Sequence, residues 1–457
     1  MNVPQPLLPH IAPELRRRTL VVGLGATGLS VARFFAAAGV KTAVTDTRVQ
    51  PPGHDEIAAR HPDVGLFLGG FDPAAFARAE QVIVSPGVSV AEPLIAAARE
   101  RGVSILGDIE VFARHVQAPV FAVTGSNGKS TVTTLIGNMA RRAGKAVRVG
   151  GNLGRPALDL LADGPAAAYV LELSSFQLET TTKLECAAAC VLNVSPDHLD
   201  RYPGFADYAA AKERILHHAR KAVLGWDDPT CRAMVRRLPA GASAVGFGVS
   251  EDDARYRLTE RDGAPWLMRD GEPLLPASAI RLPGRHNHLN ALAAWAMGEA
   301  MGLPDRFMAE ELRSFPGLPH RAQWVAEQDG VTWINDSKGT NVGAAVAALS
   351  GLPGKSVLIA GGDGKGADFT PLKAALQAHA RALVLLGRDA PVIAAAADDV
   401  IPVESVATLD EAVAAAGRWA EPGDTVLFSP ACASFDQFEN YAVRGEAFMD
   451  AVRGRLA

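Results

Sequence analysis

Two glycine-rich turns constrain the fold of this chain most. The first, Gly23–Gly28, follows an apolar run from Thr19, and the second, Thr124–Thr131, follows an apolar run from Val120. A helical pattern comes after each turn. A buried strand, a glycine turn and a helix in this order begin a βαβ unit, whose strands lie parallel. We therefore expect an α/β protein that contains more than one such unit.

Short apolar runs continue this alternation along the chain. The expected strands of a first segment lie at 19–23, 41–46, 81–84 and 103–106. Those of a second segment lie at 120–124, 168–173 and 187–194. Those of a third segment lie at 356–360, 382–386 and 425–428. Helical stretches separate the runs, so each segment is predicted to hold a mostly parallel sheet.

Two Asp-Gly pairs, Asp262-Gly263 and Asp270-Gly271, change the pattern between 245 and 283. Asp-Gly favours tight hairpin turns, so we expect an antiparallel insert there. A helix from about 286 to 301 follows, and 315–320 is a candidate linker because its prolines and glycine stop regular structure. The predicted domains are residues 1–107, 108–317 and 318–457.

Composition excludes several classes of protein. The 457 residues are 48% hydrophobic and 21% charged, as in folded globular proteins, and the net charge of −5 gives no field that would recruit nucleic acid. No apolar run reaches the roughly 18 residues of a membrane span, and the basic cluster near the N-terminus follows a Pro-broken segment, unlike a signal peptide. Four scattered cysteines predict no disulfide framework, and we expect the reducing cytoplasm. Cys186 and Cys190 are interpreted as buried small side chains.

The first turn predicts a nucleotide site. Its backbone amides and the following helix N-terminus can meet a diphosphate, while Asp46, at the end of the next strand, can meet a sugar hydroxyl. Tight packing of strand on helix is the alternative explanation. The pattern does not identify the nucleotide, and it prompts one hypothesis of a different class, an NAD-dependent oxidoreductase.

The second turn resembles a phosphate-binding loop, although Val123 stands where such loops have their first glycine. Amides of this turn would wrap phosphate oxygens, Lys129 would neutralise β- and γ-phosphate charge, and a Ser or Thr hydroxyl would reach Mg²⁺. A basic helix start after a glycine turn is the alternative. This is the strongest local signal in the chain.

Further polar residues follow the strands of the second segment. Glu172, and the stretch Asp197-His198-Leu199-Asp200, could supply Mg²⁺ ligands, although a structural role explains His198 equally well. Taken alone, Lys212 in an alanine-rich helix is expected to be solvated. Asn287 is a candidate helix cap, and Asn290 shares its face.

Polar loops also follow strands of the third segment. They comprise His320-Arg321 and the stretches 335–341, 361–365 and 429–438. Two of them carry a lysine, so together they predict a site for anionic groups at the carboxyl edge of a sheet.

Five phrases of the sequence, taken together and in order, resemble the Mur ligase family of ATP-dependent amide-bond-forming enzymes of peptidoglycan synthesis. They are 150–154, 171–179, 197–203, 335–338 and 429–434. The resemblance extends over nearly the whole chain and is strongest to the member that joins D-glutamate to UDP-N-acetylmuramoyl-L-alanine. It implies an N-terminal Rossmann-like domain, a central ATPase domain and a C-terminal Rossmann-like domain, and a monomer is expected. Sibling ligases, including folylpolyglutamate-type enzymes, and a nucleotide-binding module without ligase activity are the alternatives.

The resemblance also implies the ligand of each site residue. ATP would contact Gly125, Asn127, Gly128, Lys129, Ser130, Thr131, Asn287, Asn290, His320, Arg321 and Asp336. The UDP substrate would contact Ala26, Thr27, Asp46, Thr47, Arg48, Gly87, Asn152 and Ser174. D-Glutamate would contact Lys338, Thr340, Lys365, Ser434, Phe435 and Tyr441. Two Mg²⁺ ions would be held by Ser130, Glu172, His198 and Lys212, the last as a carbamate.

The implied reaction has two steps. The L-alanyl carboxylate attacks the γ-phosphate of ATP to give an acyl phosphate, and the amine of D-glutamate then displaces phosphate. Lys129, His198 and Lys212 are the implied catalytic residues. Gly339 and Phe435 depart from the family pattern, where alanine and leucine are commoner, so the amino-acid pocket is expected to differ in fine shape.

Overall fold

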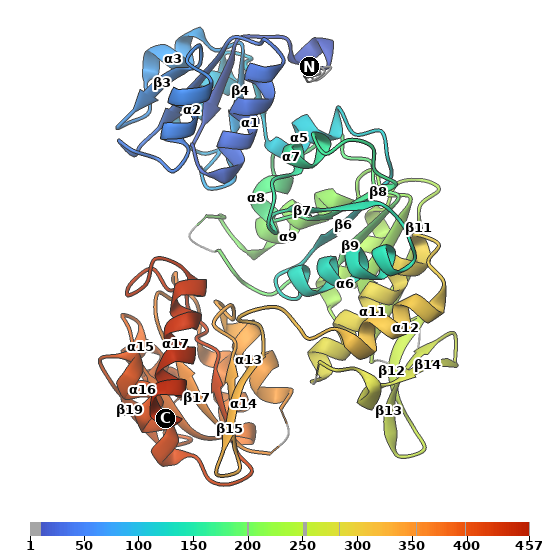
Figure 1. Ribbon diagram of the computed structural model, residues 1–457, viewed down its shortest axis with the longest axis vertical. Helices are drawn as coiled ribbons and strands as arrows, with labels where there is room; N and C mark the ends of the chain where they lie inside the picture. Colours follow the sequence, from blue (N-terminus) through green and yellow to red (C-terminus); the bar gives the residue numbers. More distant parts are fainter. Residues whose placement is uncertain are drawn as a thin grey trace, which may run out of the picture.

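The computed structural model describes residues 11–198, 201–249, 254–282, 284–352, 354–397 and 399–456. Leu199 and Asp200, which belong to the candidate Mg²⁺-binding stretch, and the first ten residues lie outside these ranges. Three α/β bodies follow one another along the long axis of the molecule, with the N-terminal body at one end and the C-terminal body at the other (Figure 1). In the described ranges, no helix is long and apolar enough to cross a membrane.

The N-terminal sheet is parallel, with the strand order β3-β2-β1-β4-β5. The chain moves outward from β1 to β3 and returns on the other side of β1 as β4, so the order reverses there. A Cβ atom at Gly28 would lie 1.8 Å from the carbonyl oxygen of Gly23, so glycine lets α1 start this close to the end of β1. The strands are β1 Thr19–Val22, β2 Thr42–Asp46, β3 Gly65–Leu68, β4 Gln81–Val84 and β5 Ser104–Leu106. The helices are α1 Ala26–Ala37, α2 His54–Arg60, α3 Pro73–Arg78 and α4 Pro93–Glu100.

The central sheet is mixed, with the order β14-β13-β12-β11-β10-β9-β6-β8-β7. Its strands from β7 to β12 are parallel, whereas β12, β13 and β14 pair antiparallel and confirm the expected insert. Asp262 and Asp270 have φ of 52° and the glycines after them 75° and 84°, the left-handed backbone of tight hairpin turns. The strands are β6 Val120–Thr124, β7 Val147–Gly151, β8 Ala168–Glu172, β9 Ala188–Val191, β10 Lys221–Gly225, β11 Ser243–Gly248, β12 Tyr256–Arg261, β13 Ala264–Arg269 and β14 Glu272–Pro276. The helices are α5 Asp108–Ala113, α6 Lys129–Arg142, α7 Ala157–Leu161, α8 Ser175–Leu178, α9 Phe205–Glu213, α10 Pro229–Met234, α11 Arg285–Ala300 and α12 Asp305–Ser314.

The C-terminal sheet has the order β15-β16-β20-β17-β18-β19 and is parallel except for β15. One core cluster, with α13, α14 and α15, covers one face, and a second, with α16 and α17, covers the other. The strands are β15 Gln323–Gln328, β16 Val331–Asn335, β17 Ser356–Ala360, β18 Ala380–Leu385, β19 Val403–Ser405 and β20 Thr425–Phe428. The helices are α13 Val342–Ser350, α14 Thr370–His379, α15 Ala390–Ala397, α16 Leu409–Trp419 and α17 Tyr441–Leu456.

The predicted α/β architecture is therefore confirmed, with three corrections of detail. The strands β3, β7, β10, β15 and β19 were not predicted, and β9 is shorter than the apolar run that indicated it. Asn287 does not cap α11, because the helix already begins at Arg285 and Gly284 is its N-cap. The cysteines of the described residues are all buried and unpaired, which confirms the predicted burial of Cys186 and Cys190.

Candidate active site

The second glycine turn connects β6 to α6 and folds around the amine of Lys129. Gly125 and Gly128 have φ of 150° and 85°, a backbone that residues with a Cβ rarely adopt. The Lys129 ammonium reaches back and donates to the carbonyl oxygens of Gly125 at 2.8 Å and Ser126 at 2.9 Å. Burial lowers the pKa of Lys129, while the charge of Glu172 opposes that shift. The turn thus presents one cation beside a set of backbone amides at a helix N-terminus, which suits a phosphate group.

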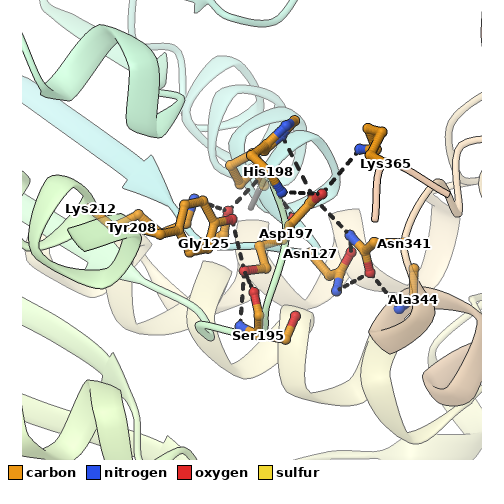
Figure 2. Close-up of polar contacts among 12 residues, drawn as sticks. Gly125, Asn127, Ser195, Asp197, His198, Tyr208, Lys212, Asn341, Ala344 and Lys365 are labelled. Atoms are coloured by element: carbon orange, nitrogen blue, oxygen red, sulfur yellow. Dashed lines mark hydrogen bonds and ion pairs between the residues drawn. The ribbon is translucent and has the colours of Figure 1, made fainter. Parts of the chain in front are cut away.

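The Lys212 side chain also reaches the second glycine turn. Its helix pattern alone predicted a solvated lysine, and that prediction is wrong. Its side chain, on α9, is only 2% exposed. Its amine donates to the Gly125 carbonyl oxygen at 2.9 Å and lies 4.5 Å from the ring centre of Tyr208 (Figure 2). Burial, together with the nearby charge of Lys129, lowers the pKa of Lys212 well below its usual value. A buried amine with so low a pKa can lose its proton and act as a nucleophile.

Glu172 ends β8, directly beside β6 in the sheet, and is 2% exposed. Its Oε1 atom accepts a hydrogen bond from Asn152 Nδ2 at 2.6 Å, whereas Oε2 is buried and has no hydrogen-bond partner in the described structure. A buried carboxylate oxygen without a partner is costly unless a cation compensates it. This orphaned oxygen fits a metal ligand.

His198, in the loop between β9 and α9, adopts a positive φ of 55°. Its ring packs edge-on against Phe176, and its Nε2 atom lies 3.6 Å from Asp197 Oδ2. Burial lowers the pKa of His198 to about 4, so its imidazole is neutral at pH 7 and can act as a ligand. In the described ranges, no three His, Cys, Asp or Glu side chains gather as a metal site. A metal here would therefore also need the Ser130 hydroxyl or a modified Lys212.

A cavity of about 680 Å³ extends from this turn between the central and C-terminal bodies. Among the residues expected to contact ATP, its lining includes Asn127, Gly128, Thr131, Asn287, Asn290, Arg321 and Asp336. The Arg321 guanidinium donates to the Ser130 hydroxyl at 2.7 Å across the two bodies. Asp336 accepts from the Ser429 hydroxyl at 2.7 Å, and burial raises its pKa to about 6.

Four residues expected to contact ATP are not in this lining: Gly125, Lys129, Ser130 and His320. The first three belong to the turn itself. The structure places the His320 side chain elsewhere, with Nδ1 3.0 Å from Asn335 Nδ2 and Nε2 3.6 Å from Glu446.

The residues expected to hold D-glutamate lie on the C-terminal body, and Lys338 is the one among these six that lines the larger cavity. Lys338 lies with its amine 3.6 Å from the ring centre of Tyr441, and burial lowers its pKa to about 8. Lys365 pairs with Asp197 of the central body at 3.1 Å. Ser434 is buried and Thr340 is half-buried, but Phe435 is 72% exposed, so its side chain is not enclosed by a pocket.

A second cavity, of about 500 Å³, lies where the strand order of the N-terminal sheet reverses. Among the residues expected to contact the UDP substrate, its lining includes Ala26, Thr27, Asp46, Thr47, Arg48, Gly87 and Asn152. Asp46 accepts from the Leu24 amide at 2.7 Å and pairs with Arg48 at 2.7 Å. Ser174 is not in the lining; it caps α8, and Gln177 of that helix lines the cavity instead.

Sequence reasoning gave no separate role to Gln177 or Arg201. The Arg201 guanidinium crosses from the central body and donates to the carbonyl oxygens of Pro86 at 3.2 Å and Val88 at 3.0 Å, on the loop that lines the second cavity. Both residues belong to phrases that carried the family resemblance, so membership in those phrases was the available signal.

Comparisons with known proteins agree along nearly the whole chain. The family models that match are "Mur ligase MurD-like, N-terminal domain" at residues 17–107, "Mur ligase middle domain" at 123–298 and "Mur ligase, glutamate ligase domain" at 320–432. The UDP-N-acetylmuramoylalanine–D-glutamate ligase of Nitrosococcus oceani is 52% identical over 450 residues, which is 98% of this chain and 99% of that protein. The same-named ligase of Marinobacter nauticus is 53% identical over 445 residues, 96% and 98% of the two chains.

Solved structures show the same fold at lower identity. The UDP-N-acetylmuramate-alanine ligase of Thermotoga maritima matches with a TM-score of 0.61 and 20% identity, covering 96% of this chain and 100% of that one. The three bodies, the phosphate-binding turn and these matches lead to one conclusion. The chain belongs to the Mur ligase family.

Proposed function

We propose that this chain joins D-glutamate to UDP-N-acetylmuramoyl-L-alanine in peptidoglycan precursor synthesis, with ATP converted to ADP and phosphate. The observation that carries this proposal is the 52% identity, over nearly the full length of both chains, to a ligase named for that reaction. Family membership also accounts for the first glycine turn, so the NAD-dependent oxidoreductase hypothesis has no support left. The intact Lys129, Glu172 and Lys212 argue against a binding module without ligase activity.

ATP is proposed to occupy the larger cavity with its phosphates on the second glycine turn. The buried amides of Asn287 and Asn290 line the cavity together and suit recognition of a base edge. Arg321 and Lys129 bring positive charge to the phosphates, and Asp336 is proposed to meet the ribose. His320 was expected to contact ATP, but its orientation favours a role in holding the loop that precedes β15.

Two Mg²⁺ ions are proposed at Ser130, Glu172, His198 and a carbamate on Lys212. The orphaned Glu172 oxygen, the Ser130 hydroxyl and the carbamate oxygens are hard donors of the kind that suits this ion, and the neutral His198 ring would add a borderline nitrogen donor. The neutral amine of Lys212 can attack carbon dioxide and lose a proton, which converts a buried cation into an anionic oxygen ligand. When bound, the ions would neutralise charge on the phosphate oxygens.

The smaller cavity is proposed to hold the uridine diphosphate, with Asp46, Thr47 and Arg48 at one end and Asn152 at the other. D-Glutamate is proposed to bind Lys338, Thr340, Lys365, Ser434, Phe435 and Tyr441. Its two carboxylates explain why lysines and hydroxyls gather on the C-terminal body. The Lys365 ammonium forms an ion pair with Asp197 in this structure, so D-glutamate would have to replace Asp197 as the partner of Lys365.

The chain's own residues suit a two-step transfer. Lys129 lies where it can stabilise charge on the γ-phosphate as the L-alanyl carboxylate attacks and ADP leaves. The amine of D-glutamate then attacks the acyl phosphate, and phosphate leaves as the amide forms. Closure of the C-terminal body over the cavity would keep water from the acyl phosphate. His198 is neutral and could accept the amine proton, a role we propose beside that of a ligand.

We also propose the domain boundaries, the oligomeric state and the cellular compartment. The domains are 1–107, 108–317 and 318–457, the enzyme is a monomer, and it works in the cytoplasm. Unpaired, buried cysteines in the described residues fit a reducing compartment.

The test is a substrate matrix. Purified protein with Mg²⁺, ATP and UDP-N-acetylmuramoyl-L-alanine is given single amino acids, with phosphate release and product mass followed together. We expect a product heavier by one glutamyl residue with D-glutamate and none with L-glutamate, L-alanine or a diamino acid. Ligation of another amino acid would overturn the substrate assignment, and ATP binding without any ligation would favour the binding-module alternative.

A further inference from the structure

The loop after β16 meets the phosphate-binding turn through one side chain, Asn341. This residue is 7% exposed and lies immediately before α13. Its Oδ1 atom accepts the Ala344 amide at 2.8 Å and so caps the helix. Its Nδ2 atom crosses to the central body and donates to Asn127 Oδ1 and Asp197 Oδ2, both at 3.2 Å (Figure 2). One amide therefore serves a helix cap and an interdomain contact at the same time.

Asn127 is held so that its side chain points at this contact. Its backbone amide donates to Asn193 Oδ1 at 2.9 Å, and its carbonyl oxygen accepts from Asn193 Nδ2 at 3.2 Å. The Asn127 side chain returns a hydrogen bond to Asn341 Oδ1 at 3.4 Å, so the two amides pair reciprocally. Asn127 belongs to the turn that carries Lys129, so the pair ties the C-terminal body to the nucleotide loop itself.

Asp197 adds a second connection between the same two bodies. Its Oδ2 atom accepts from Asn341, and its Oδ1 atom accepts from the Lys365 ammonium at 3.1 Å. Each oxygen of the carboxylate thus holds one donor from the C-terminal body.

The first turn of α13 also packs closely against the central body. A Cβ atom at Gly343 would lie 3.1 Å from Ser195 Oγ and 3.6 Å from Asn127 Nδ2. Because a glycine stands there, the helix can approach the loop closely enough for the Asn341 amide to reach it. The loop between β16 and α13 also carries Asp336, Lys338 and Thr340 just before Asn341, so the contact of Asn341 with the central body helps to position them.

We propose that Asn341 is a positioning residue that latches the C-terminal body onto the phosphate-binding turn. The latch rests on the proposed function for its consequence in the reaction: it aligns the D-glutamate site with the activated carboxyl group and keeps water from it. The UDP substrate site, which lies between the N-terminal and central bodies, is not part of the latch.

Two substitutions separate the latch from the helix cap. Asn341→Ser keeps a residue that caps helices well but is too short to cross to Asn127. Asn341→Asp keeps both the cap and the length, but it replaces the crossing donor by a carboxylate opposite Asp197. Thr408→Ala is the matched control, because Thr408 caps α16 on the opposite face of the same sheet.

The kinetic test compares the KM for D-glutamate with the KM for the UDP substrate in each variant. For Asn341→Ser we expect the KM for D-glutamate to rise about tenfold, a loss on the scale of one or two hydrogen bonds. We expect a larger rise for Asn341→Asp and a KM for the UDP substrate within twofold of the parent. Phosphate released per amide formed should exceed one, because water reaches the acyl phosphate. Thr408→Ala should lower the melting temperature, but it should leave both KM values and the ratio of phosphate to amide unchanged. Unchanged ratios in both Asn341 variants, or equal changes in the Thr408 control, would overturn the latch.

Small-angle X-ray scattering with ADP keeps this test independent of ligase activity. We expect a larger radius of gyration for Asn341→Asp than for the parent, because the C-terminal body moves away from the turn. If the parent makes no D-glutamyl product but the variant opens, the proposed function fails and the latch stands. If the parent ligates D-glutamate and both variants stay as compact as the parent, the latch fails and the function stands.

Discussion

The two glycine turns of this chain have the same local architecture but different chemistry. Each follows a buried parallel strand and leads into a helix at a cavity. In the second turn, Lys129 and Lys212 both donate to the carbonyl oxygen of Gly125. In the first turn, the anchoring charge is Asp46, which accepts the Leu24 amide and pairs with Arg48.

This difference shows how the same strand–turn–helix unit can either bind a phosphate or activate it for transfer. The amides of a helix N-terminus are enough to bind a diphosphate that does not react. Transfer of a phosphoryl group needs fixed positive charge where negative charge develops. Lys129 supplies that charge at the second turn, so substitutions there should affect kcat, and substitutions at the first turn should affect KM.

The largest expected effect comes from removing the cation of the second turn. Lys129→Met should lower kcat about 1,000-fold, because the removed ammonium stabilises charge in the transition state. The KM for the UDP substrate should stay within twofold, since its cavity is separate. Steady-state kinetics with varied UDP substrate would check this. An equal loss from a first-turn substitution such as Thr27→Ala would contradict the comparison.

Lys212→Met should lower kcat about 100-fold without lowering the melting temperature. The substitution replaces a buried amine by an apolar side chain of similar shape, which the protein interior accommodates well, whereas loss of a metal-positioning group costs activity. Activity assays beside thermal unfolding separate the two. In the parent enzyme, removal of dissolved carbon dioxide should lower activity and bicarbonate should restore it. A parent insensitive to bicarbonate would contradict the carbamate.

Lys212 also shows where prediction from sequence stops. The second turn could be recognised from its own residues, because glycines and a lysine at fixed spacing form a local structure. The Asp-Gly hairpins were predicted for the same reason. A single lysine in an alanine-rich helix carries no such pattern, and its burial results from packing of α9 beside the end of β6. Only the family resemblance pointed to it.

The remaining misses have the same physical origin. β3 is a four-residue strand at a sheet edge, and so short a strand shows too little hydrophobic periodicity to be distinguished from a loop. The exposure of Phe435 and the orientation of His320 depend on how distant segments pack. The sites of nucleotides and anions could be predicted as loops at strand ends, but not the contacts between bodies, such as that of Asn341 with Asn127.

Asp46→Asn tests the first turn. The variant keeps an oxygen that can accept the Leu24 amide, but it removes the charge that holds Arg48. We expect the KM for the UDP substrate to rise about tenfold with kcat unchanged, since a charged hydrogen bond contributes about 1.5 kcal/mol or more. Initial rates at saturating ATP and D-glutamate would show this split. A fall in kcat with an unchanged KM would mean that the first turn takes part in the chemistry.

The smallest effect is a pH dependence confined to D-glutamate. Burial lowers the pKa of Lys338 to about 8. A lysine is charged below its pKa, so between pH 7 and pH 9 its charged fraction falls from about nine tenths to about one tenth. The KM for D-glutamate should therefore rise several-fold over this range, while the KM for the UDP substrate stays level because Lys338 does not line the smaller cavity. Lys338→Arg is the control, since arginine keeps its charge at pH 9. Because the amine of D-glutamate itself titrates in both proteins, only the part of the rise that arginine abolishes belongs to Lys338, and an identical rise in both would assign it to the substrate.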